Sequence, residues 1–495
     1  MPKPNLLFIF TDEQRADTLA AYGNRRIQMP NLNRLAEQSV VFDQAYVTQP
    51  VCTPSRSSIM TGLYPHTSGL TENNLALPDE VPCLVELLDQ PAEYVKGYYG
   101  KWHLGDEIFK QHGFDDWVGI EDNYIEYYSP KRDRDTRCEY HHWLVANGFT
   151  PKNGSVFGRG EAARLPEAFG KPAFLGQEAS RFIRENKDNP FILYVNFLEP
   201  HMPFFGPRDN QYSPDAVKLP GNFSDPPTAD QPLKAQIYQK AYYERGHSGL
   251  PLKTEADWRR MIAHYWGLCS LVDTHVGRIL DTLSECGLDD NTIVVYTSDH
   301  GDMMGSHRLI AKTVMFEEAA RVPFLVRLPG QKRSWRVRGP VSQVDIVPTL
   351  LDLLGQPVPS GLEGQSLRSA VEAGRDSALQ DDVFIEWSGH NNGFGDVIGQ
   401  VVLPEGAEGL ATPEQMAAAI LDPVRTVITP DGWKLNYSPT LGEHELYNLA
   451  ADPLEVNNLA RRAEHRPRMR ELAGRIVGWQ ERTGDQVEVK PESIR

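Results

Sequence analysis

Three short apolar runs, each followed by acidic or histidine residues, constrain the fold of this chain most strongly. They occupy residues 6–10, 191–197 and 292–296, and such runs are typical of strands covered on both faces of a sheet. Between the second and third run, an amphipathic pattern from Trp258 to Leu283 predicts a long helix. A strand, a helix and a strand in this order pair in parallel. We therefore expect an α/β fold with a large, mixed, mostly parallel sheet flanked by helices.

The end of the chain has a different pattern and predicts a second, smaller unit. The 495 residues exceed the usual span of one hydrophobic core, and residues 356–380 are rich in proline, glycine and serine. Short strands are expected at residues 424–428, 433–437 and 445–449. A helix at about residues 461–481 is expected to cover them. We predict a large α/β domain at residues 1–365 and a smaller subdomain, an antiparallel sheet with a terminal helix, at residues 366–495.

Charge and hydropathy exclude some classes of partner. The formal net charge is −17, so no basic surplus is present to neutralise nucleic-acid phosphates. No apolar stretch reaches 18 residues, and the run at residues 6–10 is too short for a signal peptide. We expect no nucleic-acid partner, no membrane partner and a cytoplasmic location, whereas an already removed leader would indicate the periplasm or secretion. Nothing in the sequence indicates an oligomeric state.

A second informative stretch begins at Cys52 and reads Cys-Thr-Pro-Ser-Arg, with a Thr-Gly pair five residues after the arginine. Thr53 is placed to cap a short helix, Pro54 suits its first turn and Gly62 suits its end. Residue 52 would then lie at a helix N-terminus, where free N–H groups and the helix dipole favour an oxyanion. The alternative is a small buried thiol without a chemical role.

The Cys52 stretch resembles the maturation signature of the type I sulfatases, the formylglycine-dependent members of the alkaline phosphatase superfamily. In that family the cysteine is oxidised to formylglycine, which implies a maturase or formylglycine-generating enzyme as a partner. Residues 446–459 are similar to the family's C-terminal subdomain, so the resemblance covers nearly the whole chain. It implies an alkaline phosphatase-like fold and a catalytic domain at residues 1–365. This domain would hydrolyse a sulfated sugar or an aryl sulfate to inorganic sulfate and an alcohol.

Acidic residues and a histidine follow two of the predicted strands closely. Asp12 and Glu13 follow the first strand, and Asp299 and His300 follow the third. Carboxyl ends of parallel strands meet at one edge of a sheet, and hard cations take several oxygen ligands. The resemblance implies that these four residues hold a divalent cation, with an oxygen of the modified Cys52 completing the shell.

Two of these positions depart from the family pattern. Glu13 stands where many relatives have aspartate or glutamine, and His300 where many have asparagine. We expect Ca²⁺ as the first choice, with Mg²⁺ or Mn²⁺ as alternatives favoured by the nitrogen ligand. The alternative for Asp12 and Asp299 is that they cap the turns that follow them.

Five further positions match the family by motif. Around Lys101 and His103 the chain reads Gly-Lys-Trp-His-Leu-Gly; in the resemblance, Lys101 binds sulfate and His103 holds or deprotonates the hydroxyl that stays behind. His201 matches the histidine that protonates the leaving alcohol, and histidine titrates in the useful range. Lys312 matches a lysine on the sulfate and the leaving oxygen, and Arg56 would stabilise the transferring anion as an always-charged fork. Alternatively, the lysines are solvated charges and the histidines are structural.

Three rival functions stay open. Phosphonate monoester and phosphodiester hydrolases of the same superfamily resemble the chain at the cysteine motif but lack the lysine-histidine string, so Lys101 and His103 favour sulfate esters. A second rival is a non-catalytic protein that binds sulfated sugars and keeps Cys52 unmodified. A third is a plain cysteine hydrolase that uses the Cys52 thiolate with His103 or His201.

Two segments are candidates for the substrate-binding surface. Residues 121–150 are dense in side chains that stack on sugars or bind carboxylates. They are Tyr124, Tyr127, Tyr128, Arg132, Arg134, Arg137, His141, His142 and Trp143. The alternative for this segment is an irregular surface insertion. Trp387, His390, Asn391 and Asn392 form a weaker candidate of the same kind.

Overall fold

The large sheet has ten strands and is mixed, which confirms the predicted fold class. The computed structural model describes residues 3–390 and 397–494. Nine strands follow one another in the order β10-β9-β2-β8-β6-β1-β5-β3-β4, and β7 pairs with β2. Their bounds are β1 (Asn5–Asp12), β2 (Val40–Tyr46), β3 (Val95–Gly100), β4 (Asp116–Val118), β5 (Phe191–Pro200), β6 (Thr292–Ser298), β7 (Arg321–Val322), β8 (Phe324–Arg327), β9 (Trp335–Ser342) and β10 (Ser377–Ala378). Within the described residues, only β7 and β8 run antiparallel to their neighbours.

The three predicted apolar runs form the adjacent strands β5, β1 and β6. β1 pairs in parallel with both neighbours, and the register places Phe10 beside Asn196 and Thr11 beside Ser298. The side chains from Leu6 to Phe10 are fully buried, because helices cover both faces of the sheet. The carboxyl ends of these strands therefore lie side by side, and they position the residues that follow them.

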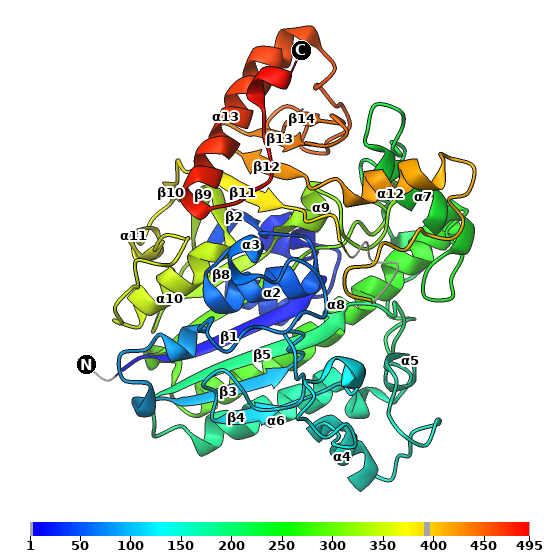
Figure 1. Cartoon of the computed structure of the whole chain (residues 1–495). Coiled ribbons are helices and arrows are strands. Elements are labelled where there is room, and N and C mark those ends of the chain that lie inside the picture. Colours follow the sequence, from blue (N-terminus) through cyan, green and yellow to red (C-terminus); the bar gives the residue numbers. More distant parts are fainter. Residues whose placement is uncertain (1–2, 391–396, 495) are drawn as a thin grey trace.

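Helices form a layer on each face of the sheet (Figure 1). The predicted long helix is α8, and it packs with α6 and α1 behind the strands, whereas α2, α3 and α10 lie in front. The helices are α1 (Pro30–Ala36), α2 (Cys52–Thr61), α3 (Pro65–Ser68), α4 (Glu139–Ala146), α5 (Arg159–Ala162), α6 (Lys171–Glu185), α7 (Leu233–Arg245), α8 (Glu255–Glu285), α9 (Glu317–Ala320), α10 (Ile346–Leu353), α11 (Arg368–Val371), α12 (Pro413–Leu421) and α13 (Arg466–Thr483).

Helix α2 begins two residues earlier than predicted. Cys52 is its first residue, and Val51, not Thr53, occupies the N-cap position without a side-chain capping bond. The Thr53 hydroxyl donates instead to the carbonyl of His103 at 2.7 Å, so this side chain ties the helix to a distant loop. Gly62 ends the helix with a φ of 73°, as predicted.

The second sheet is antiparallel and is covered by the terminal helix, as predicted. Its order is β11 (Val383–Glu386), β12 (Arg425–Ile428), β13 (Trp433–Tyr437) and β14 (Glu445–Asn448). Helix α13 packs on this sheet, where Trp479 stacks on Phe384 with ring centroids 5.2 Å apart. The boundary after residue 365 stays a prediction, and β10 beyond it still pairs with β9 of the large sheet.

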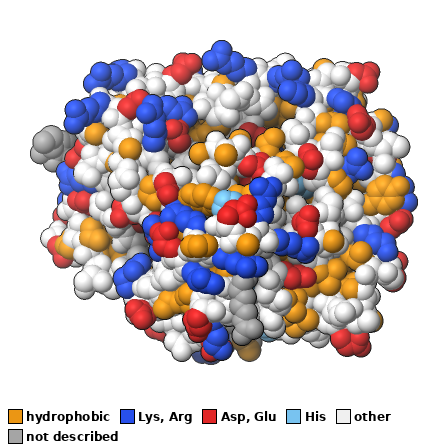
Figure 2. Space-filling view, turned by 90° about the horizontal axis from the view of Figure 1, so that it is seen from above, with side chains coloured by type: hydrophobic (Ala, Val, Ile, Leu, Met, Phe, Trp, Pro, Cys, Tyr) orange, Lys and Arg blue, Asp and Glu red, His pale blue; other side chains and the backbone are white. Residues whose placement is uncertain are grey.

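The molecular surface mixes both signs of charge despite the net charge of −17. On the face in Figure 2, lysine and arginine side chains alternate with aspartate and glutamate, and hydrophobic side chains are scattered among them. Among the described helices, none is long and apolar enough to span a membrane.

Candidate active site

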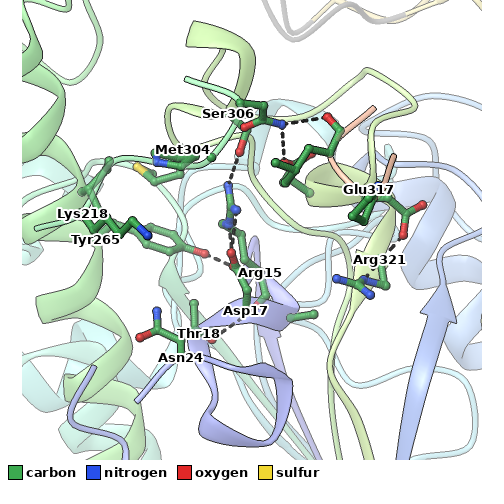
Figure 3. Close-up of a pocket in the computed structure, with 18 of the residues that line it drawn as sticks. Arg15, Asp17, Thr18, Asn24, Lys218, Tyr265, Met304, Ser306, Glu317 and Arg321 are labelled. Atoms are coloured by element: carbon green, nitrogen blue, oxygen red, sulfur yellow. Dashed lines mark hydrogen bonds and ion pairs between the residues drawn. The ribbon is translucent and has the colours of Figure 1, made fainter. Parts of the chain in front are cut away.

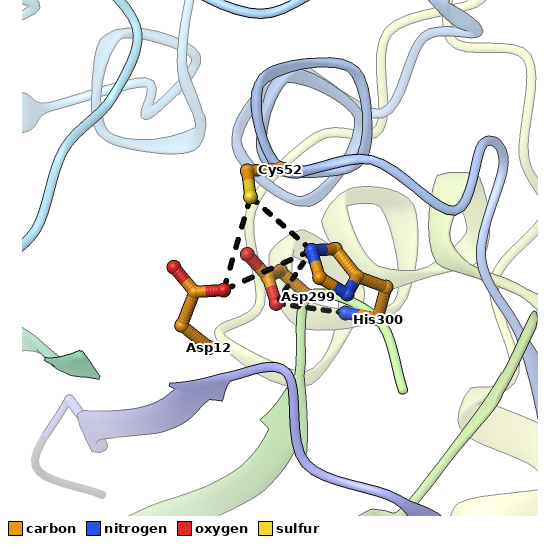
Figure 4. Close-up of side chains that lie close together, drawn as sticks. All are labelled: Asp12, Cys52, Asp299 and His300. Atoms are coloured by element: carbon orange, nitrogen blue, oxygen red, sulfur yellow. Dashed lines mark hydrogen bonds and ion pairs between the residues drawn. The ribbon is translucent and has the colours of Figure 1, made fainter. Parts of the chain in front are cut away.

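The ends of β1 and β6 bring four side chains close together (Figure 4). Asp12 is the last residue of β1, Asp299 and His300 follow β6, and Cys52 begins α2. Cys52 Sγ lies 3.2 Å from His300 Nε2 and 3.8 Å from Asp12 Oδ1. His300 Nε2 lies 3.7 Å from an oxygen of each aspartate. The four side chains are buried. Together they are called the floor of the site.

Two buried cations neutralise the carboxylates of this floor. Arg56 Nη2 lies 3.0 Å from Asp12 Oδ2 and 2.9 Å from Asp299 Oδ2. Lys101 Nζ lies 2.5 Å from Asp12 Oδ2. Burial by itself would raise the pKa of Asp12, but Lys101 and the other cations around it hold this pKa well below its ordinary value. Asp12 is therefore an ionised carboxylate at neutral pH.

The environment of Cys52 favours an anion at its side chain. Burial and the charge of Asp12 oppose ionisation, but Lys101 and Lys312, helped by His300, lower the pKa of the thiol below its ordinary value. The position at the first residue of α2 acts in the same direction, because free backbone N–H groups point at it.

Glu13 lies beside this floor and faces a different pair of side chains. Its carboxylate lies 3.1 Å from Lys312 Nζ and 3.7 Å from His201 Nε2. It forms a second cluster with Asp12 and His201, so the two clusters share Asp12. Burial raises the pKa of Glu13 to about 8, against the opposing charge of Lys312.

The donor atoms of the floor fit a divalent cation. Those of Asp12, Cys52, Asp299 and His300 all lie within 4.8 Å of one another. Carboxylate oxygens with one imidazole nitrogen suit Ca²⁺, Mg²⁺ or Mn²⁺. Glu13 lies beside these atoms, with Oε1 3.1 Å from Lys312 Nζ and Oε2 3.7 Å from His201 Nε2, so it too has an oxygen to offer.

The loop after β3 carries two of the predicted catalytic residues in an unusual conformation. Gly100 has a φ of 122°, and a Cβ atom there would come within 1.9 Å of the Asn196 carbonyl oxygen, so only glycine fits. His103 has a φ of 57°. The buried carboxylate of Glu107 accepts the backbone N–H groups of Trp102 and His103, at 2.8 and 2.5 Å. This carboxylate holds the loop in place.

Both predicted catalytic histidines are buried and have fixed ring orientations. Burial, reinforced by nearby lysine charges, holds the pKa of His103 and of His201 well below the ordinary value. His103 Nε2 lies 2.9 Å from Asn74 Oδ1. His201 Nδ1 lies 2.8 Å from the Met202 carbonyl oxygen, which assigns the proton of the neutral ring to Nδ1.

The site opens into a pocket of about 450 Å³. Its described lining residues are Cys52, Asn73, Asn74, Lys101, His103, Asn123, Tyr124, Glu126, Tyr127, Arg159, His201, Met202, Tyr242, Arg245, His247, Ala311, Lys312 and Thr313. Five of the six predicted catalytic residues reach this pocket. The sixth, Arg56, lies beneath the floor with 1% of its surface exposed.

Asn196 is a residue of the site that sequence reasoning missed. Its side-chain oxygen accepts a hydrogen bond from Arg56 Nη1 at 2.7 Å, and its amide donates to the carbonyl of Phe10 at 3.0 Å. It therefore joins β5 to β1 and fixes the arginine beneath the floor. The signal was present, because Asn196 is the one amide side chain in an apolar run that predicts a buried strand.

Only part of the aromatic segment 121–150 faces the pocket. Tyr124 and Tyr127 line it. Arg132 instead pairs with Asp106 at 2.8 Å, and Trp143 packs among aromatic neighbours. Residues 139–146 form helix α4 and not the irregular surface insertion that was the alternative, so neither interpretation describes the whole segment.

Trp387, from the second segment predicted to bind substrate, does not line this pocket. Trp387 is fully buried, and its indole N–H donates to the carbonyl of Ile420 at 3.1 Å. His390 is exposed. Asn391 and Asn392 lie outside the described residues.

A second pocket, of about 190 Å³, is lined by the segment that follows Glu13 (Figure 3). Two of its arginines, Arg15 and Arg321, form ion pairs with Asp17 and Glu317. Arg15 lies 2.7 Å from Asp17 and also donates to the carbonyl of Met303 at 2.7 Å. None of the predicted site residues lines it, so the pocket above Cys52 is the candidate active site.

Comparisons with known proteins identify the family of the chain. Residues 4–356 match the sulfatase family. The chain is 30% identical to an ulvan-active sulfatase of Formosa agariphila over 75% of its own length and 65% of that protein's length. It is 26% identical to an N-acetylglucosamine-6-O-sulfatase of Bacteroides thetaiotaomicron, over 95% of this chain and 85% of the relative.

A solved structure shows the same fold over the whole chain. The phosphonate monoester hydrolase of Agrobacterium radiobacter superposes with a TM-score of 0.75 at 24% identity, covering 98% of this chain and 97% of that one. The family match spans well over half of the chain. The chain is therefore a hydrolase of the sulfatase family, within the alkaline phosphatase superfamily.

Proposed function

We propose that the protein hydrolyses the sulfate ester of a carbohydrate through a formylglycine formed from Cys52. The observation that carries this proposal is the position of Cys52: it opens into the pocket between Lys101 and Lys312 and lies directly above the carboxylates of Asp12 and Asp299. A sulfate ester needs cations around its oxygens and a nucleophile at its sulfur, and this arrangement offers both.

Two groups supplied by maturation and by the solvent complete the chemistry. Formylglycine, as its hydrate, would supply one hydroxyl whose oxygen bonds to sulfur as the bond from sulfur to the alcohol oxygen breaks. Loss of the proton from its second hydroxyl would then re-form the aldehyde and release the sulfate. A divalent cation held by Asp12, Asp299 and His300, with Glu13 nearby, supplies acidity to the group at residue 52. The maturase that oxidises Cys52 is the partner that this proposal requires.

The cations of the site divide into two roles. Lys101 and Lys312 line the pocket and would contact the oxygens of the sulfate. Arg56 does not line the pocket, so it acts by holding Asp12 and Asp299 in place. It is a positioning residue in this proposal, whereas the sequence motif suggested direct contact with the transferring group.

His201 is placed to protonate the leaving alcohol. Its Nδ1 donates to a carbonyl, which leaves Nε2 to take up and deliver a proton. In the free site, burial and Lys312 hold its pKa well below the ordinary value. A bound sulfate ester brings negative charge next to Lys312 and therefore raises the pKa of His201. Binding of substrate would thus prepare the acid.

His103 is placed to take the proton of the group that stays on the enzyme. Its Nε2 faces Asn74, and its Nδ1 is buried without a hydrogen-bond partner in the described residues. A neutral imidazole with a free nitrogen is a competent base.

A carbohydrate substrate is supported by the relatives. Their names include an ulvan-active sulfatase and an N-acetylglucosamine-6-O-sulfatase. Tyr124 and Tyr127 give the pocket aromatic surfaces on which a sugar ring would stack. An arylsulfatase of Clostridium perfringens, 28% identical over 96% of each chain, keeps aryl sulfates as useful assay substrates.

A second candidate function is hydrolysis of phosphonate monoesters or phosphodiesters. It is favoured by the 25% identity over 97% of this chain to the multifunctional alkaline phosphatase superfamily protein PehA of Trinickia caryophylli. Lys101 and His103 in the pocket favour the sulfate ester. Rates with 4-nitrophenyl sulfate and with a phenylphosphonate monoester, on the same preparation, decide between them.

The test of the main proposal combines a mass and a rate. We expect the peptide that spans residue 52, from active protein, to carry an aldehyde in place of the thiol. We expect Cys52→Ala to fold normally and to lose sulfate ester hydrolysis by at least about 10⁴-fold. An active preparation with only unmodified thiol, or an active Cys52→Ala variant, would show that the formylglycine mechanism is wrong.

A further inference from the structure

We propose that the alcohol half of the substrate carries a second anionic group, a carboxylate or a further sulfate, and that Arg159 binds it. This inference rests on the proposed function, since it names the class of sulfate ester that the pocket accepts. It rests on three features of the structure: the free edge of Arg159, the surplus charge behind it and its place in the pocket.

Arg159 has one edge bonded to protein and one edge free. Its Nε and Nη2 atoms donate to the two oxygens of Glu121 at 2.7 and 2.6 Å, and Nη2 also donates to the Tyr124 hydroxyl at 2.6 Å. In the described part of the chain, no acceptor bonds Nη1. The residue lines the pocket above Cys52, so this free edge is available to a ligand in the pocket.

The charge of Arg159 is not cancelled by its partner. Glu121 is fully buried at its side chain and is shared by Arg159 and Lys171, whose Nζ lies 2.5 Å from Glu121 Oε1. Two cations therefore share one carboxylate. Glu199, near Lys171, is only partly ionised at neutral pH, because burial raises its pKa to about 7. The cluster keeps a positive surplus beside the pocket, in a chain whose net charge is −17.

The two lysines among the described lining residues, Lys101 and Lys312, already have carboxylate partners. Lys101 pairs with Asp12 and Lys312 with Glu13, so both belong to the centre where the sulfate reacts. Arg159 instead forms its ion pair with Glu121, although the charge of Asp12 also helps to raise the pKa of Arg159. Among the described lining residues of this pocket, Glu126 is the one carboxylate, and it is exposed. An anion entering beside Arg159 therefore meets little repulsion.

Tyr124 sets Arg159 apart from the reacting sulfate. The centroid of its ring lies 4.4 Å from the centroid of the His103 ring and 6.0 Å from Lys101 Nζ. On another part of the same side chain, its hydroxyl accepts from Arg159. A sulfate held at Lys101 is thus not the group that Arg159 binds, and the second anion belongs to the remainder of the substrate. Arg245 lines the same pocket from the end of α7.

The experiment compares matched substrates on matched variants. The substrates are a panel of monosulfated sugars and the same sugars with either a uronic acid carboxylate or a second sulfate, which separates the two sources of negative charge. We expect wild-type kcat/KM to be at least about 10-fold higher for the better of the two doubly charged panels, since a charge-assisted hydrogen bond in a pocket has this size. Arg159→Met should remove that preference, mainly through KM, and change kcat/KM for the monosulfated sugars by less than about 3-fold.

Two variants guard against a general structural effect. Arg164→Met removes a nearby arginine that stacks on Phe205 and does not line this pocket, and it should keep the preference. Arg159→Lys keeps a charge, and it should recover part of the preference at an unchanged melting temperature. The inference would be overturned if wild type had about the same kcat/KM for doubly charged and monosulfated sugars. It would also be overturned if Arg159→Met lost kcat/KM equally for both kinds of sugar.

Failure of the proposed function gives a different result. If the protein cleaves no sulfate ester, calorimetry with the doubly charged sugars still measures binding to Arg159. Weaker binding to Arg159→Met than to wild type, with inorganic sulfate bound equally by both, would support the anion site without the activity. Equal binding of the sugars to both proteins would refute it.

Discussion

The floor and the wall of the pocket use charge in opposite ways. The floor is Asp12, Cys52, Asp299 and His300, and its carboxylates are paired with Arg56 and Lys101 in full burial. The wall is the cluster of Tyr124, Arg159, Glu121 and Lys171, in which two cations share one carboxylate. Three of the four floor residues lie at strand ends, and Cys52 begins α2. The wall comes from the long segment after β4 and from Lys171, which begins α6. A balanced floor suits a fixed reaction, and an unbalanced wall suits selection among substrates.

The largest expected effect breaks the balance of the floor. Arg56→Met leaves Asp12 and Asp299 buried without their shared partner, which typically costs about 3–5 kcal/mol of unfolding free energy. Arg159→Met should cost less, about 1–3 kcal/mol, because Glu121 keeps Lys171. Chemical denaturation of both variants measures the difference. Equal costs would mean that the floor and the wall do not differ in this way.

A divalent cation should stabilise the protein through the floor alone. At a concentration about 100-fold above its Kd, a bound cation adds about 2.7 kcal/mol to the unfolding free energy. We expect Ca²⁺, Mg²⁺ or Mn²⁺ to raise the melting temperature of wild-type protein after treatment with a chelator. Asp299→Asn should lose this shift, and Glu126→Gln, at an exposed lining residue of the pocket, should keep it. A shift that survives Asp299→Asn would place the cation elsewhere.

Asn196 tests whether the floor depends on a residue beneath it. Asn196→Leu removes the acceptor of Arg56 Nη1 and the donor to Phe10, at a cost of about 1–3 kcal/mol. Because Arg56 then loses its orientation, we expect kcat to fall by about 10-fold with little change in KM. Asn186→Ala, at the end of α6, serves as the control and should leave both constants unchanged. An unchanged kcat in Asn196→Leu would show that its role is only structural.

The smallest expected effect concerns pH and a third region, where α3 meets the C-terminal subdomain. His66 Nδ1 lies 2.7 Å from Glu386 and Nε2 lies 3.3 Å from the Thr483 carbonyl oxygen. Burial opposes the charge, but Glu386 raises the pKa of His66 above 6.5. The stabilisation is therefore complete below the unfolded-state pKa and is lost as the pH rises through the folded-state pKa.

The measurement is the melting temperature of wild type and His66→Gln as a function of pH. We expect the variant to be less stable at about pH 5.5, by no more than about 1 kcal/mol, and the gap to close towards about pH 9. A gap that widens with pH would contradict the assignment of a charged His66.

The sequence predicted the parts of the fold that depend on local patterns. The runs that became β5, β1 and β6 were visible because a strand buried on both faces needs continuous apolar residues. The long helix α8 was visible from its periodic apolar residues. The strands β3 and β9 and the helix α6 were not predicted. β3 is rich in glycine and tyrosine, and a glycine-proline pair interrupts the alternation of β9.

The residues of the candidate site likewise fall into those predicted from local sequence patterns and those that were missed. Asp12, Asp299 and His300 were predicted because they follow apolar strands directly. Asn196 was not, because its partner Arg56 lies 140 residues away in the chain. The partners of the catalytic loop, such as Glu107, were missed for a related reason: a single buried carboxylate has no periodic pattern.

By itself, the sequence determined the strand ends, the Cys52 motif and the family, because each depends on residues adjacent in the chain. Only the tertiary structure decided which charges pair. It placed Arg56 beneath the floor and left an edge of Arg159 facing the pocket. The physical reason is that the energy of a charge depends on burial and on the groups around it. Both are set by residues far apart in the sequence.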